Sequence, residues 1–325
     1  MKKDKYLDIS LIVPVFNISS VVEKVLESIK IQTYPIREII VIDNHSSDNS
    51  VDLIKKFIKN NKRMKIKLIE RDRTYGISSS YNLGAKLSKS KYIVSLHSDS
   101  VLPTRNEIKK LVKPFEKDSK VVASYPFVVH TRNVWLKYNF WQKCLFGTVY
   151  GTERPSMNGK FDCYRKTDFL QIGGYDEKKF SPHIGTEDAD MHHRLEKRGK
   201  VISSRARVVH VHGIDKNYSL KDWIARRKFL SVSYGRYIKM HANDMGLEVL
   251  LFFVNPLLVT CALLGFINYL FLVPVLLFPF IYFRKMFFDP AIFLNPRIIL
   301  LPFILYFLIF YESFWLLESI LFKKL

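Results

Sequence analysis

Short apolar runs alternate with longer amphipathic stretches through the first hundred residues of this chain. The runs predict buried strands, and apolar residues spaced three and four apart between them predict helices. We expect strands at 11–15, 38–42, 65–69 and 92–96, and helices over 22–29, 48–59 and 79–87. Strands that alternate with helices in this way predict an α/β fold, a mostly parallel sheet with helices on both faces.

Polar side chains follow the predicted strands at the points where the strands end. Asn17 follows the first strand, Asp43 and Asn44 follow the second, and His97 and Asp99 follow the fourth. In open α/β sheets, ligands bind beyond the carboxyl ends of the strands. The pattern therefore predicts one ligand site at this edge of the sheet.

The C-terminal part of the chain is apolar over two long stretches, 247–283 and 298–322. A helix needs about 20 apolar residues to cross the hydrocarbon core of a membrane. The first stretch is long enough for a hairpin of two helices and the second for one more. We therefore expect an α/β domain at 1–218, an interfacial region at 219–246 and a membrane region at 247–325, with two or three helices at about 248–266, 267–283 and 298–322.

The net charge of the chain is +21, and the apolar tail accounts for little of it. The residues from 247 onward include five basic and four acidic side chains, so +20 falls on residues 1–246. Such an excess favours nucleic acid, anionic lipid or a phosphorylated small substrate as partner. The tail favours membrane lipid, and no aromatic-basic RNA-binding motif is present, so we expect no nucleic-acid partner.

The cysteines and the start of the chain bear on its location. Cys144, Cys163 and Cys261 have no metal-ligand spacing and indicate no disulfide framework, which fits a reducing compartment. The first ten residues run into a predicted strand without the apolar core of a signal peptide. We expect a multi-pass protein of the cell membrane with its α/β domain in the cytoplasm. The positive-inside rule agrees for the loop 284–297 and disagrees for the lysines near the chain end, so the number of spans stays open.

Residues 220–241 combine aromatic and basic side chains at helical spacing. Arg226, Arg227 and Arg236 lie among aromatic residues such as Trp223 and Tyr234. One interpretation is a basic amphipathic helix on the membrane surface, whose arginines would bind lipid phosphate or a diphosphate. The other, equally open, is an ordinary packed helix with a solvated face.

Asp99 and His97 close the fourth predicted strand and would leave it on the same side. A carboxylate with a neutral imidazole is a plausible ligand pair for manganese or magnesium, and histidine favours manganese. The alternative is a turn in which Asp and Ser bond to the local backbone. The two readings are equally weighted on these residues alone.

Glu187 and Asp188 stand in the first turn of a predicted helix, TEDADMHHRL. Acidic residues there stabilise the helix dipole, and they can also place a general base beside an acceptor. His210 and His212 alternate along a predicted strand, share a face, and could add a metal ligand or be structural.

Seven segments, taken in order, resemble a family 2 glycosyltransferase with the GT-A fold. They are LIVPVFN (11–17), QTYP (32–35), EIIVIDNHSSDNS (38–50), YGISSSYNLGAKLSKSKYIVSLHSD (75–99), IGGYDE (172–177), TEDADMHHRL (186–195) and ARVVHVHG (206–213). Together they cover nearly all of residues 9–213. The resemblance implies a Rossmann-like GT-A catalytic domain followed by a membrane-spanning α-helical tail.

The resemblance also implies roles for single positions. Asp99 would hold Mn²⁺ or Mg²⁺ as the metal-binding member of an Asp-x-Asp motif, and His210 would approach the metal or the diphosphate. Asp188 would be the catalytic base, with Glu187 supporting it. The nucleotide sugar would contact Pro14, Val15, Asn17, Asp43, Asn44, Asn82 and His97.

The chain departs from the family pattern at four points, one of which is Ile18 in place of a frequent glutamate. His97 stands where the first aspartate of Asp-x-Asp is usual, and Asn44 stands where a second aspartate is common. The Gln-x-x-Arg-Trp motif of processive synthases is absent, with WIARR at 223–227 in the comparable region. The last departure favours transfer of single sugars over polymerisation.

The expected function is that of a membrane-bound, inverting, metal-assisted glycosyltransferase. It would move one sugar from a nucleotide-diphosphate donor to a lipid-linked or glycan acceptor, with Asp188 as general base. A polyprenyl-phosphate sugar synthase is the main alternative, and there the acceptor phosphate needs no strong base. A second alternative, motivated by His97, is a membrane scaffold whose active site has degenerated.

Overall fold

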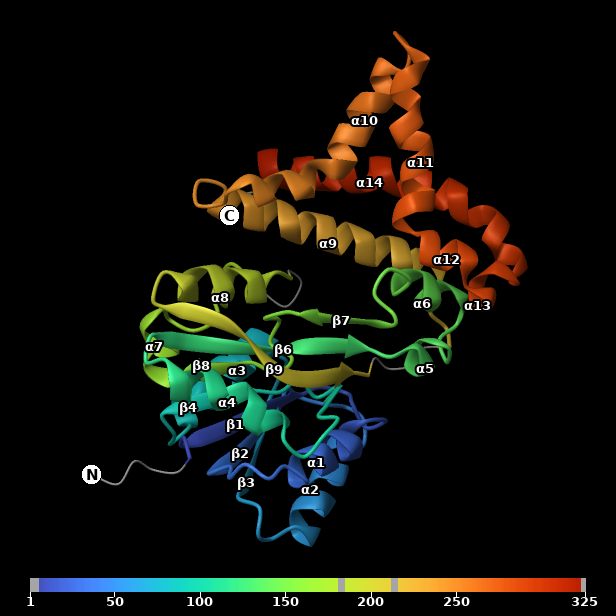
Figure 1. Cartoon of the computed structure of the whole chain (residues 1–325). Coiled ribbons are helices and arrows are strands. Elements are labelled where there is room, and N and C mark those ends of the chain that lie inside the picture. The colour runs from blue at the N-terminus through green and yellow to red at the C-terminus, as the bar shows by residue number, and fades with distance from the viewer. Residues whose placement is uncertain (1–5, 181–184, 212–215, 323–325) are drawn as a thin grey trace. The chain divides into compact units, whose positions relative to one another are not determined.

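The computed structural model describes residues 6–180, 185–211 and 216–322 (Figure 1). They fall into two units that are not continuous in sequence. The first unit contains Met1–Thr131, Gly151–Pro182 and Glu187–Gly213, and the second contains Arg132–Tyr150, His183–Thr186 and Ile214–Leu325. The segment 132–150, which the sequence placed with the α/β domain, thus groups with the C-terminal residues.

A mixed sheet runs through the described part of the first unit. Its strand order is β3-β2-β1-β4-β8-β6-β9-β5, and β7 pairs with β6. The strands are β1 (Ile9–Val15), β2 (Glu38–Asp43), β3 (Ile66–Glu70), β4 (Tyr92–Ser95), β5 (Ser100–Val101), β6 (Val121–His130), β7 (Thr152–Pro155), β8 (Cys163–Arg165) and β9 (Lys200–His210). The α/β class and the four predicted N-terminal strands are confirmed.

The sheet is parallel where the sequence pattern was clearest and mixed beyond it. Strands β3, β2, β1 and β4 pair in parallel, and so do β6 and β9. Strand β8 is antiparallel to both β4 and β6, β7 is antiparallel to β6, and β5 is antiparallel to β9. The register sets Val15 beside Asp43 and Asp43 beside Glu70, so the polar strand ends line one edge.

Two apolar cores lie on the two faces of this sheet. Leu11 and Val13 of β1 pack in the first core, and Ile12 between them packs in the second, because neighbouring strand residues point to opposite faces. The first core includes apolar residues of α1 (Val22–Lys30), α2 (Ser50–Asn60) and α4 (Glu107–Lys117); the second includes those of α3 (Ile77–Leu87), α7 (Lys166–Gln171) and α8 (Glu187–Glu196). Burial on both faces explains the continuous apolar run of β1.

The second unit is helical in its described residues. Its α-helices are α5 (Arg132–Trp135), α6 (Phe140–Leu145), α9 (Leu220–His241), α10 (Val254–Leu264), α11 (Leu272–Tyr282), α12 (Arg284–Phe288), α13 (Pro290–Phe293) and α14 (Leu301–Leu321), with 3₁₀ turns η1 (Leu247–Phe253), η2 (Tyr269–Phe271) and η3 (Pro296–Leu300). Helices α9 and α14 approach closely at Gly235, where a Cβ atom would lie 2.6 Å from Cβ of Ser319. The Ser319 hydroxyl donates a 2.8 Å hydrogen bond to the Val232 carbonyl.

The helix 220–241 forms as predicted, and small residues make up part of its buried face. Trp223 is buried, whereas Tyr234 is 38% exposed and the small residues Ser231, Ser233 and Gly235 are buried. Packing against α14 selects these small side chains because they allow the two backbones to approach. The helix is therefore packed along α14, and the membrane-surface interpretation stays a prediction.

Among the described residues, one helix is long and apolar enough to cross a membrane. It runs from Pro296 to Leu321 and has 26 residues, and its most apolar stretch of 18 residues has a mean hydropathy of 1.9. The apolar helices Val249–Leu264 and Tyr269–Tyr282 are shorter than the spans expected at 248–266 and 267–283. A break at Gly265–Asn268 and the 3₁₀ turn η2 divide this stretch.

Candidate active site

His97, Asp99 and His210 lie together at the end of the sheet. The pairing of β5 with β9 sets Ser100 beside His210, which brings Asp99 to the same place. The Nδ1 atom of His97 lies 2.7 Å from Oδ1 of Asp99, and Nε2 of His210 lies 2.9 Å from Oδ2. The expected pair does not stand on the strand itself, because β4 ends at Ser95 and a turn bonds the Ser100 N–H to the His97 carbonyl.

Both members of the Asp99–His210 contact have displaced pKa values. Burial alone would raise the pKa of Asp99, but the imidazoles of His97 and His210 hold it well below its ordinary value. Burial lowers the pKa of His210 to about 4, against the opposing effect of Asp99. Asp99 is thus an ionised carboxylate, and His210 is a neutral imidazole at neutral pH.

His97, Asp99 and His210 are side chains of the types that bind divalent cations. One carboxylate and two imidazoles converge, and neutral imidazole is the form that ligates metals. A mixed nitrogen and oxygen set suits manganese better than magnesium, which prefers oxygen ligands. His212, which the sequence offered as a further ligand, lies outside the described residues.

Glu187 and Asp188 begin α8, as predicted. Asp188 accepts a 2.9 Å hydrogen bond at Oδ1 from the Ala189 N–H. Burial, and after it the neighbouring Asp188 charge, raise the pKa of Glu187 to about 7. Burial also raises the pKa of Asp188, while Lys160 opposes that rise. Raised carboxyl pKa values at a helix start are typical of a general acid or base.

The histidine–aspartate cluster and the carboxyl pair lie within electrostatic reach of one another. The charge of His97 acts on the pKa of Glu187, after the effects of burial and Asp188. The Tyr81 ring lies near both groups, because Asp99 and Glu187 each act on its hydroxyl pKa, which burial raises well above its usual value. Asp99 and the Glu187–Asp188 pair therefore share an electrostatic environment within the first unit.

The residues expected to border a nucleoside lie at the carboxyl ends of β1 and β2. Asn17 has a positive φ of 48° and accepts a hydrogen bond from the Ser47 N–H at 2.8 Å. Asp43 accepts from the Ser46 N–H at 3.1 Å, and Asn44 accepts from the Tyr75 N–H at 2.9 Å. Three of the predicted donor-binding residues thus shape the loops at one edge of the sheet.

The family model described as "Glycosyl transferase family 2" matches residues 10–171, about half of the chain. These residues include β1, β2, the His97–Asp99 turn and the whole loop that leads to β8. This chain belongs to glycosyl transferase family 2. The expectation drawn from its seven segments is confirmed.

Two curated relatives of this family 2 member match over 187 residues each. Poly-beta-1,6-N-acetyl-D-glucosamine synthase of Staphylococcus epidermidis is 25% identical, covering 54% of this chain and 44% of its own length. The O-antigen chain rhamnosyltransferase RfbN of Salmonella typhimurium is 28% identical, covering 53% of this chain and 56% of its own length. The chain therefore spans about half the length of the curated relatives it matches.

Solved structures support the GT-A fold of the family 2 glycosyltransferase. Mannosyltransferase PcManGT from Pyrobaculum calidifontis, solved with GDP-Man and Mn²⁺, is similar over 98% of this chain and 89% of that chain. The TM-score is 0.60 and the sequence identity is 14%. At this identity the likeness establishes the fold alone.

Three residues predicted to contact the donor are buried or hydrogen-bonded within this glycosyltransferase. Pro14 and Val15 are buried within β1, so their side chains face the protein interior. Both amide atoms of Asn82 are bonded to Tyr175, at 2.8 Å to its N–H and 2.8 Å to its carbonyl, and Nδ2 also donates to Glu177 at 2.7 Å. These contacts favour a structural role for Asn82 over a contact with the donor.

The three predicted phosphate-binding arginines differ in their surroundings. Arg227 pairs with Glu312, and its Nη2 atom lies 2.8 Å from Oε2. Asn255 donates to the same oxygen at 2.9 Å, which completes a buried polar group between α9, α10 and α14. Arg226 is exposed and stacks on Phe229, with 4.7 Å between its guanidinium carbon and the ring centroid, while Arg236 is half-buried. The pairing favours a structural role for Arg227.

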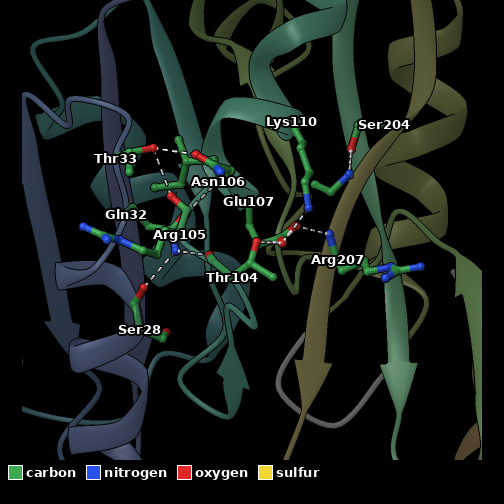
Figure 2. A network of polar contacts seen from close by, with 12 residues as sticks. Ser28, Gln32, Thr33, Thr104, Arg105, Asn106, Glu107, Lys110, Ser204 and Arg207 are labelled. Atoms are coloured by element: carbon green, nitrogen blue, oxygen red, sulfur yellow. Dashed lines mark hydrogen bonds and ion pairs between the residues drawn. The ribbon is translucent and has the colours of Figure 1, made fainter.

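A polar network beside β9, shown in Figure 2, includes a buried residue that the sequence did not single out. Glu107 is fully buried; its carboxylate accepts from the Arg207 N–H at 2.7 Å, from Lys110 at 2.8 Å and from the Thr104 hydroxyl. Gln32 of the QTYP segment donates to the Thr104 carbonyl at 2.7 Å. The network holds β9 three residues before His210, and Gln32 joins it from the QTYP segment.

Two further residues at the site were missed because no strand end or family motif marks them. Lys160 lies in the loop between β7 and β8, and its charge acts on the pKa of Asp188. Asp162 is fully buried two residues later and accepts from the Gly159 N–H at 2.6 Å. An isolated lysine and an isolated aspartate give no sequence signal, since their neighbours come from distant segments.

Proposed function

We propose that this chain is an inverting glycosyltransferase that transfers one sugar from a nucleotide-diphosphate sugar to a lipid-linked or glycan acceptor. In this reaction an acceptor hydroxyl oxygen bonds to the anomeric carbon as the bond from that carbon to the diphosphate oxygen breaks. Asp188 takes the hydroxyl proton, and the nucleoside diphosphate leaves with the bonding electrons. Glu187 supports Asp188.

The observation that carries the proposal is the convergence of two groups at one edge of the sheet. Asp99 contacts His97 and His210 within 2.9 Å. Glu187, beside Asp188, is within electrostatic reach of His97. The reaction requires a carboxylate that can take a proton, as Asp188 would, close to the groups that stabilise the departing diphosphate. Asp99, with His97 and His210 beside it, would belong to those groups.

Asp99, His97 and His210 would hold Mn²⁺ or Mg²⁺ in this enzyme. When bound, such a cation supplies positive charge to the diphosphate that leaves. Membership of family 2 and the complexes of a structural neighbour with Mn²⁺ support this assignment. Asn17, Asp43 and Asn44 would contact the nucleoside.

The acceptor assignment rests on the apolar second unit and on the named substrates of the relatives. We propose that Pro296–Leu321 attaches the enzyme to the cell membrane and that the shorter apolar helices accompany it as further membrane-embedded segments. A synthase of a polymer and an O-antigen chain transferase are among the relatives. Both names refer to glycan assembly, which supports a glycan or lipid-linked acceptor here.

A screen of nucleotide sugars tests the proposal. The purified full chain, in detergent, is incubated with UDP-, GDP-, and dTDP-sugars with Mn²⁺, with Mg²⁺ and with EDTA, and release of the nucleoside diphosphate is measured. We expect one donor to be consumed in a metal-dependent way. Asp99→Ala and Asp188→Ala should each reduce the rate by about 100-fold or more. Asp52→Ala, which changes an exposed aspartate of α2, is the matched control.

The outcomes separate the alternatives. A chain that binds no nucleotide sugar, with or without metal, is the scaffold rather than the enzyme. Donor turnover that persists in Asp188→Asn indicates a polyprenyl-phosphate acceptor, because a phosphate oxygen is already ionised and needs no base. Either result contradicts the proposal as stated.

A further inference from the structure

The loop between β7 and β8 is fastened to the end of β4 immediately beside the site. The His97 N–H donates a 3.0 Å hydrogen bond to the Lys160 carbonyl, and the Ser95 N–H donates to the Asp162 carbonyl at 2.8 Å. Lys160 is therefore a backbone neighbour of the turn that carries Asp99. None of the seven sequence segments quoted for the family resemblance includes this loop, although it falls within the residues that the family model matches.

A glycine and a buried carboxyl set the direction of the loop at Lys160. Gly159 has a φ of 71°, a left-handed conformation that residues with a Cβ rarely adopt. Its N–H donates to Asp162 at 2.6 Å and its carbonyl accepts from the Tyr81 hydroxyl at 2.8 Å. Tyr164 donates to the same Asp162 oxygen at 3.2 Å. Both polar groups of the Gly159 backbone are thus held by buried partners.

The Lys160 side chain brings a positive charge into the site without being neutralised there. Lys160 is half-buried, and within the described part of the chain its ammonium forms no ion pair. Burial is the largest influence on the pKa values of Glu187, Asp188 and His210, and the Lys160 charge acts on all three. Its ammonium is therefore within electrostatic reach of both the carboxyl pair and the histidine–aspartate cluster.

We propose that Lys160 binds the diphosphate of the nucleotide-sugar donor. This inference rests on the proposed function. An ammonium that forms no ion pair, on a loop bonded to the His97 turn and within electrostatic reach of both groups, can meet an anion that arrives with the substrate. Lysine binds phosphate as a point charge. The charge on the diphosphate grows as the sugar leaves, so the contact strengthens during the reaction. The ammonium supplies this charge from the chain itself, beside the turn in which His97 stands.

Binding of nucleoside diphosphates and of nucleosides separates this role from a structural one. UDP, GDP and dTDP, and the matching nucleosides, are titrated by calorimetry into the full chain in detergent, with Mn²⁺ and again in EDTA. We expect Lys160→Met to weaken binding of the preferred diphosphate by about tenfold in both conditions, the size of a hydrogen bond to a charged group. Affinity for the nucleoside should not change. Lys160→Arg should retain most of the diphosphate affinity.

Lys113→Met, which changes an exposed lysine of α4, is the matched control and should bind as the wild type does. The assignment is overturned if Lys160→Met binds the diphosphate as tightly as the wild type. It is also overturned if nucleoside and diphosphate binding fall together, which indicates a distorted loop. A wild-type chain that binds none of the three diphosphates instead overturns the proposed function on which the inference rests.

Discussion

His210 places its Nε2 atom 2.9 Å from Oδ2 of Asp99, although 111 residues separate the two in the sequence. The antiparallel pairing of β5 with β9 produces this contact, because it sets Ser100 beside His210. Glu107 holds the same strand by accepting a hydrogen bond from the Arg207 N–H. The sheet therefore holds His210 in place, so a substitution at Asp99 should leave the position of His210 unchanged.

Replacing Asp99 with Asn tests the charge of this carboxylate while preserving its shape. Asparagine cannot provide the anionic oxygens that a hard divalent cation prefers. We expect donor turnover to fall by about 100-fold or more, and Mn²⁺ binding, measured by electron paramagnetic resonance of the free ion, to weaken. Asp52→Asn should behave as the wild type. Full Mn²⁺ affinity in Asp99→Asn would remove Asp99 from the proposed metal site.

Replacing Asp188 with Asn tests the general base. The amide keeps the hydrogen-bond acceptor for the Ala189 N–H but cannot take a proton. We expect kcat to fall by about 100-fold or more, with the affinity for the nucleoside diphosphate unchanged, because the base acts on the acceptor. Kinetics and calorimetry on the same preparation measure the two quantities. An equal loss in both would show that Asp188 supports donor binding instead.

The buried carboxyl of Asp162 should make stability depend on pH. Burial raises its pKa from 3.8 to about 7, although the Gly159 N–H and the Tyr164 hydroxyl oppose the rise. The folded state therefore holds a proton that the unfolded chain releases near pH 4, so this contribution to stability falls as pH rises from about 4 to about 7. Asp162→Asn has no such proton. We expect its unfolding free energy to fall less over this range, by on the order of 2–4 kcal/mol.

Chemical denaturation at pH 4.5 and 7.5 measures that difference. Asp118→Asn is the control, since this aspartate is on the surface and pairs with Lys200 at 2.7 Å. Wild type and Asp162→Asn that lose stability in parallel between the two pH values would contradict the raised pKa.

The adjacent glycines of IGGYDE offer a matched pair of substitutions. Gly173 and Gly174 both have left-handed backbone, with φ of 83° and 72°. A Cβ on Gly173 meets no atom within 4 Å, but a Cβ on Gly174 would lie 2.3 Å from Oδ1 of Asn82. That oxygen is held by the Tyr175 N–H at 2.8 Å and cannot move without breaking the bond.

We therefore expect Gly173→Ala to lose about 1–2 kcal/mol from backbone strain alone, and Gly174→Ala to lose at least 1 kcal/mol more from the broken Asn82 contact. Thermal or denaturant unfolding of the two variants side by side makes the comparison. Equal losses of unfolding free energy would mean that the Asn82 side chain can move aside. Its hydrogen bonds to Tyr175 would then contribute little to stability.

The sequence by itself determined the local elements and the chemical class of the site. Apolar runs of period-two and helical spacing gave β1 to β4 and their helices, because burial on two faces demands such patterns. Polar residues at strand ends marked Asn17, Asp43 and Asp99 as one edge, since parallel strands present their carboxyl ends together. The sequence also predicted that α8 begins with the acidic residues Glu187 and Asp188.

Tertiary structure alone decided what depends on contacts between distant segments. The antiparallel insertion of β8, the grouping of 132–150 with the C-terminal helices and the buried face of α9 follow from packing that no local pattern encodes. The same holds for Asn82, whose amide is taken up by Tyr175, and for Lys160, whose loop is bonded to His97. A side chain acquires its role from neighbours that the fold supplies, and those neighbours lie far away along the chain.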